Sequence, residues 1–192
     1  MKGRYLGYYS RRDLNSTLGE AVVLIPAGIL RWSDEGLIPL DTWVFLSLMA
    51  SLEASERSEH VIVAPPVYVS LSKPHVAEEL LAKCITALIK DLKKVGFSRF
   101  VIVTLEKLSE SAAEKALRSL EGVEVIGPKT LSFWEEKYAS LILSMWREVF
   151  PQTEEKYAVL FSSEDRRKGI KIWRTVVKEI LCKAESLRKR RE

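Results

Sequence analysis

Short, continuous apolar runs alternate along the chain with longer segments in which apolar residues recur every three or four positions. The runs cover residues 21–25, 61–64, 100–103, 123–126 and 157–161. Unbroken apolar runs bounded by Gly or Pro are typical of strands buried on both faces, whereas the longer period is typical of helices that pack on a core. The alternation predicts an α/β fold, a three-layer α/β/α sandwich with a mostly parallel sheet.

Capping and turn signals delimit the helical segments. We expect helices at about 42–55, 74–95, 111–121 and 132–150, and a terminal helix from about 164. Pro26 should end the first strand, Pro74 should begin the second helix, and Gly96 and Gly122 should end the second and third. Capping boxes are predicted for the third and fourth helices at Ser111 with Glu114 and at Ser132 with Glu135.

Ligands of such sheets bind at the carboxyl ends of the strands, which here lead into loops 28–41, 65–75 and 104–109. The side chains expected near that edge are Arg31, Trp32, Asp34, Glu35, Asp41, His75 and Glu106. Arg31 suggests a small anionic ligand, because a guanidinium binds a carboxylate or phosphate through two parallel hydrogen bonds. The favoured alternative is that Arg31 pairs with Asp34 or Glu35 and fills the site.

Several kinds of chemistry lack their motifs. The chain has no G-x-G-x-x-G, no G-x-x-x-x-G-K-(S/T) and no G-x-S-x-G, so dinucleotide, P-loop and serine-hydrolase sites have no support. Two isolated histidines and two isolated cysteines predict neither a zinc cluster nor a disulfide. The loop carboxylates could hold Mg²⁺, Ca²⁺ or Mn²⁺, but we favour reading them as solvated loop charges and helix-start acids.

Composition indicates an ordinary globular protein. The 192 residues are 47% hydrophobic and 29% charged, which predicts one domain over residues 1–192. No apolar run is long enough to cross a membrane and no signal-peptide core is present, so we expect a cytoplasmic protein. One Asn and one Gln beside 30 basic and 26 acidic residues are typical of a thermophilic source.

The net charge of +4 is concentrated in a basic helical tail at about 183–192, which holds five basic and two acidic residues. Such a tail could bind nucleic acid or an acidic partner. Basic residues at a helix C-terminus also complement the helix dipole, and this simpler reading is favoured. Nucleic acid is therefore not an expected partner.

Three segments carry a family resemblance. The residues VLIPAG (23–28) and LIPLDT (37–42) resemble the creatininase family, the metal-dependent amidohydrolases in which a strand runs into P-x-G-(S/T)-x-E-x-H-G-x-H-L-P-L-x-T-D. APPVY (64–68) with Ser72 and His75 is similar to that family's P-x-x-Y-G-x-S-x-x-H loop. VGFSRFVIV (95–103) is similar to the strand before its N-G-H-G-G-N turn. The resemblance implies a creatininase-like fold over about residues 20–145.

The family's metal ligands do not recur at the matching positions. They fall at Arg31, Ser33, Trp43 and Glu106, and a further family glutamate falls at Glu136. Family members bind two divalent ions, commonly zinc or manganese, and Arg31 places positive charge where those cations would lie. The resemblance therefore implies a non-catalytic protein without metal, which binds or assembles as a homo-oligomer or with an active creatininase-like subunit.

The alternative is a metal-dependent amidohydrolase that hydrolyses a non-peptide C–N bond at a rewired site. Its Zn, Mn or Fe ions would be held by Asp34, Glu35, Glu106 and Glu136.

Overall fold

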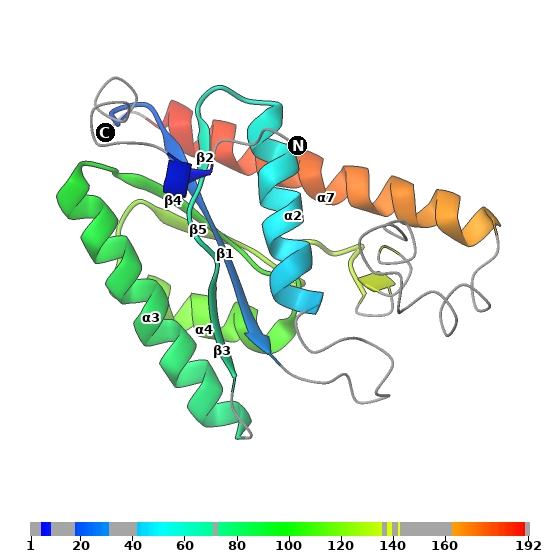
Figure 1. Ribbon diagram of the computed structural model, residues 1–192, viewed down its shortest axis with the longest axis horizontal. Coiled ribbons are helices and arrows are strands. Elements are labelled where there is room, and N and C mark those ends of the chain that lie inside the picture. Colours follow the sequence, from blue (N-terminus) through cyan, green and yellow to red (C-terminus); the bar gives the residue numbers. More distant parts are fainter. Residues whose placement is uncertain are drawn as a thin grey trace.

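A parallel sheet forms the centre of the molecule (Figure 1). The computed structural model describes residues 5–8, 18–30, 42–70, 73–135, 138–139, 142 and 163–190. Its strands are β1 (Val22–Leu30), β2 (Val61–Val63), β3 (Val67–Ser70), β4 (Arg99–Val103) and β5 (Val123–Ile126). The order is β2-β1-β4-β5, β3 pairs with β1, and all these pairings are parallel. The predicted mostly parallel α/β sheet is confirmed.

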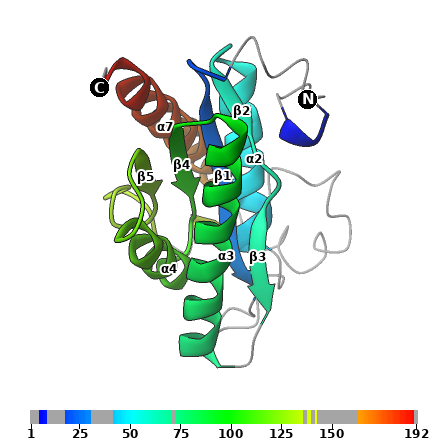
Figure 2. The same ribbon diagram turned by 90° about the vertical axis from the view of Figure 1, so that its left-hand side faces the viewer.

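Helices cover both faces of the sheet (Figure 2). One face packs against α2 (Thr42–Glu56) and α7 (Ser163–Lys189), and the other packs against α3 (Pro74–Val95) and α4 (Lys107–Leu117). Successive side chains of a strand point to opposite faces. Accordingly, Val22 and Leu24 belong to the first core, whereas Val23 and Ile25 belong to the second. The sandwich therefore has two separate hydrophobic cores.

The predicted end of the first strand at Pro26 is wrong, because β1 continues to Leu30. The N–H of Val22 and the carbonyl of Leu24 both form hydrogen bonds on the side of β1 where β2 lies. Because this side recurs at every second residue, the backbone nitrogen of Pro26 is directed to the same side. Between the part of β1 that pairs with β2 and the part that pairs with β3, two residues of β1 lie opposite the three residues 64–66. A proline is tolerated there because a bulge needs no N–H from it.

Residues 65–75 were predicted to form a loop, but they contain β3. This strand follows β2 along the same side of β1, after the interruption by Pro65 and Pro66 (Figure 2). The two prolines and an outward-facing Tyr68, which is 55% exposed, hide the strand from a search for apolar runs.

The helix boundaries agree with the sequence in three of the described helices. The starts of α2, α3 and α7 match, and Gly96 ends α3 in the left-handed conformation with φ 116°. The start predicted at Ser111 is wrong, because α4 begins at Lys107 with Glu106 as its N-cap. Gly122 does not end this helix either. It has φ 70° in the turn that precedes β5.

Other predictions fall partly or wholly outside the described residues. Residues 132–135 form a turn and an irregular segment, so the capping box predicted there is wrong. The strand at 157–161 and most of the helix at 132–150 lie outside the described part of the chain.

Among the helices that the structure describes, none has the length and apolar character needed to cross a membrane.

Candidate functional site

The structure describes only part of the predicted ligand edge. Glu106 and His75 are described, whereas the first-loop candidates and the later glutamate lie outside the described residues: Arg31, Trp32, Asp34, Glu35, Asp41 and Glu136. How those six residues are arranged therefore remains a prediction.

Glu106 lies three residues beyond the end of β4, at the carboxyl edge of the sheet, and it is completely buried. Its Oε1 accepts a hydrogen bond from the backbone N–H of Leu108 at 3.0 Å. Its Oε2 accepts from the backbone N–H of Ser109 at 2.8 Å and from the Ser109 hydroxyl. The carboxylate thus caps α4, where free N–H groups and the helix dipole favour negative charge.

Ser109 extends this arrangement to the central strand. Its Oγ donates to Glu106 and accepts a hydrogen bond from the backbone N–H of Ile29 at 3.1 Å. Ile29 lies near the end of β1, in the stretch that the sequence predicts to be loop. Glu106 and Ser109 together hold the start of α4 against the extended part of β1.

His75 does not join this cluster. It lies in the first turn of α3 and is exposed. Within the described residues, no hydrogen bond or ion pair joins His75 to Glu106. The two described candidates, His75 and Glu106, therefore do not form a common site.

A second buried carboxylate, Glu78, lies between α3 and α4. It accepts a hydrogen bond from the Ser111 hydroxyl and pairs with Lys115 Nζ at 2.9 Å. The Ser111 hydrogen bond, followed by Lys115, outweighs the opposing effect of burial and lowers the pKa of Glu78 below 4.5. The sequence predicts that Ser111 caps a helix and does not indicate its contact with Glu78.

Glu110 is a third buried carboxylate, only 1% exposed, which the sequence analysis also missed. Its oxygens lie 3.0 and 2.9 Å from the backbone N of Lys129, which donates from the turn after β5. A Cβ at Gly127 would lie 2.6 Å from the Glu110 carboxyl group, so a larger residue there would displace this carboxylate. Burial raises the pKa of Glu110 above 4.5. In the sequence, Gly127-Pro128 marks the turn after β5, but nothing there indicates the contact with Glu110.

The described residues offer no ready metal site. In this part of the chain, no group of three or more His, Cys, Asp or Glu side chains is placed to hold an ion. Both oxygens of Glu106 accept hydrogen bonds, and Trp43, which the sequence resemblance places at a family aspartate, is 1% exposed in the core. The described residues at this edge therefore do not form a metal site by themselves.

The comparisons with known proteins give the fold. Neither the known family models nor the curated proteins match the sequence. Solved structures do match: a Zn-Zn type of a mutant creatininase has 15% identity, 98% coverage of both chains and a TM-score of 0.66. A creatinine amidohydrolase (creatininase) has 16% identity, 97% coverage of both and a TM-score of 0.64. A manganese creatininase has 16% identity, 98% coverage of both and a TM-score of 0.63. The expected creatininase-like fold is confirmed.

Proposed function

We propose that this chain is a non-catalytic protein of creatininase-like fold that acts as a binding or assembly subunit. The observation that carries the proposal is the carboxylate of Glu106, which the start of α4 occupies with three hydrogen bonds. A carboxylate has about four acceptor sites, and these donors take three of them, so a metal ion bound through both oxygens would have to displace a donor inside the protein. Each buried donor left without a partner costs about 1–3 kcal/mol.

Trp43 gives independent support. By the sequence resemblance it stands where the family has an aspartate ligand, and its side chain packs in the core formed by α2, α7 and the sheet. An indole N–H is a donor only and cannot coordinate a cation. Two positions that would supply ligands in relatives therefore serve the helix start and the core in this chain.

The binding role rests on the scaffold and on Arg31. A creatininase-like fold keeps the carboxyl ends of its strands at one edge, and in the sequence Arg31 comes directly after the last residue of β1. Its guanidinium would bind a small carboxylate or phosphate. The expected partners are a second copy of this chain or an active creatininase-like subunit.

An anion screen tests the ligand part of this proposal. Small carboxylates and phosphates should raise the melting temperature of the wild type more than that of Arg31→Ala. A ligand at a hundred times its Kd stabilises a protein by about 2.7 kcal/mol. If no anion separates the two proteins, Arg31 is a structural residue and the anion site is wrong.

The second candidate function is a metal-dependent amidohydrolase acting on a non-peptide C–N bond. It is favoured by the zinc and manganese named for two of the similar structures. Asp34, Glu35 and Glu136, with Glu106, would then hold Zn, Mn or Fe ions. Such ions polarise a carbonyl and lower the pKa of bound water.

Elemental analysis of protein purified without chelator separates the two functions. The non-catalytic proposal expects substoichiometric Zn, Mn and Fe in the wild type, in Glu106→Ala and in the control Glu114→Ala. Stoichiometric metal together with amide hydrolysis, both lost in Glu106→Ala and kept in Glu114→Ala, would overturn it. Glu114 suits the control because its side chain is 44% exposed on the same helix.

A further inference from the structure

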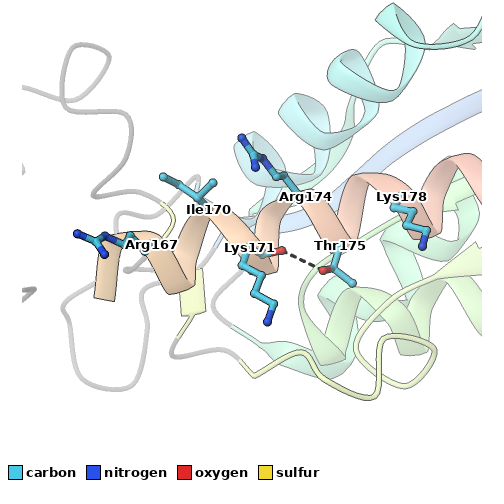
Figure 3. A pocket seen from close by; sticks show the side chains of 6 residues that line it. All are labelled: Arg167, Ile170, Lys171, Arg174, Thr175 and Lys178. Atoms are coloured by element: carbon cyan, nitrogen blue, oxygen red, sulfur yellow. Dashed lines mark hydrogen bonds between the residues drawn. The ribbon is translucent and has the colours of Figure 1, made fainter. Parts of the chain in front are cut away.

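One surface of α7 carries cations that form no ion pair with the described residues of the chain. Arg167, Lys171, Arg174 and Lys178 follow one another at intervals of three or four residues, and all four are exposed. They line a hollow of about 500 Å³ together with Ile170 and Thr175 (Figure 3). We call these four residues the basic strip. At 1.5 Å per residue, the strip is about 16 Å long.

The strip is not neutralised within the described part of the chain. None of its four cations forms an ion pair with a described residue, and the segment 167–178 contains no acidic residue. The hydroxyl of Thr175 donates to the Lys171 carbonyl at 2.9 Å, so it offers no negative charge. Four like charges side by side repel one another, and an anionic partner relieves this repulsion.

The basic tail behaves differently. Lys183 and Arg190 both pair with Glu124, and Arg188 pairs with Glu185 at 3.3 Å. The basic tail contributes most of the net charge of the sequence, and several of its cations thus already have acidic partners within the protein. The four cations of the basic strip lie about one to four helical turns before the tail.

We propose that the basic strip binds the phosphate backbone of double-stranded nucleic acid. B-DNA carries about one negative charge per 1.7 Å of axis, so a straight row of about 16 Å faces several phosphates. Arg and Lys are the side chains that make such contacts, independently of sequence. The strip presents no aromatic side chain on which an unpaired base could stack, which favours a duplex over a single strand.

Two other partners fit less well. A membrane-binding amphipathic helix must insert its apolar face, but Trp173, Val176 and Ile180 of α7 are already buried in the core. A second copy of this chain carries the same net charge of +4, which opposes association through a basic surface. Charge and shape together therefore favour nucleic acid.

Fluorescence anisotropy of a labelled DNA duplex, titrated with the full chain over a range of salt concentrations, tests the proposal. Four neutralised phosphates give a slope of about −3.6 for log K against log salt, or about 150-fold weaker binding at 200 mM than at 50 mM. The variant Lys171→Glu/Arg174→Glu/Lys178→Glu should bind at least about tenfold more weakly than the wild type.

The matched control is Lys83→Glu/Lys90→Glu/Lys107→Glu, which makes the same charge change at exposed sites on α3 and α4. It should bind at least about tenfold more tightly than the strip variant. Circular dichroism establishes that both are folded, and Lys171→Gln/Lys178→Gln gives a milder change. No binding to the duplex, or equal losses in both triple variants, would overturn the proposal. Strip-dependent binding only to anionic vesicles, or strip-dependent self-association without duplex binding, would also overturn it.

Discussion

Glu106 and Glu110 lie one helical turn apart, and both carboxylates are almost completely buried, yet they hold different parts of the protein. Glu106, at the carboxyl edge of the sheet, binds N–H groups two and three residues further along its own helix start. Glu110 binds the backbone N–H of Lys129, nineteen residues away in the turn after β5. One contact is local and the other fixes a distant loop.

The difference shows how this fold uses acidic side chains near an edge where related scaffolds bind ligands. Both carboxylates accept hydrogen bonds from other parts of the protein, which leaves fewer of their lone pairs for a cation. A buried carboxylate is stable only when it is paired in this way or protonated. The following predictions test whether these carboxylates serve stability.

The largest effect is expected for Glu106→Ala. The substitution leaves the N–H groups of Leu108 and Ser109 and the Ser109 hydroxyl without their acceptor, so unfolding should become easier by about 3 kcal/mol. Urea unfolding at neutral pH measures the change. The control Glu114→Ala removes an exposed pair with Lys129 and should cost less than about 1 kcal/mol. Equal costs for the two variants would contradict the capping role.

A smaller, pH-dependent effect is expected for Glu78→Gln. The pKa of Glu78 is lowered in the folded protein, so its contribution is present above pH 4.5 and is lost as pH falls through the lowered pKa. At neutral pH the variant should lose about 2 kcal/mol, because hydrogen bonds to a charged group are stronger than neutral ones. Unfolding free energies measured from neutral to acid pH should converge for wild type and variant. A constant difference would show that the charge of Glu78 contributes nothing.

Glu110→Gln should show the smallest effect and the opposite pH dependence. The pKa of Glu110 is raised, so its contribution is present below pH 4.5 and is lost as pH rises through the raised pKa. In acid, the Gln side chain can still accept a hydrogen bond from the N–H of Lys129, so the free energy of unfolding of the variant should be only about 1 kcal/mol lower than that of the wild type. The gap to the wild type should narrow as the same urea series moves to higher pH. A gap that widens instead would contradict burial as the dominant influence on Glu110.

The sheet was predictable because its central strands are continuous apolar runs. The predictions that were wrong concern residues whose roles depend on contacts with other segments of the chain. Pro26 reads as a strand end, but it faces a bulge at residues 64–66 and needs no partner there. Ser111 reads as a cap, but Glu106 supplies the cap and Ser111 binds Glu78 instead. Glu is not among the preferred N-cap residues, so this start is hidden from sequence rules.

The candidate site was less predictable than the fold. The sequence indicated that Glu106 lies at the ligand edge, and the structure places it there as the cap of α4. It gave no means to recognise that Ser109 would link this cap to Ile29, eighty residues earlier in the chain. The roles of the first-loop residues Arg31, Asp34 and Glu35 remain predictions.

We propose that the carboxylate of Glu106, which caps α4, stabilises the start of this helix and does not hold a metal. The most direct test of this proposal is the unfolding free energy of the wild type and Glu106→Ala, each with EDTA and with saturating Zn²⁺ or Mn²⁺. We expect that metal does not change the unfolding free energy of either protein. The difference in unfolding free energy between the wild type and Glu106→Ala should be the same with EDTA and with metal. Stabilisation of the wild type by about 2.7 kcal/mol at a hundred times the metal Kd, absent from Glu106→Ala, would contradict the proposal.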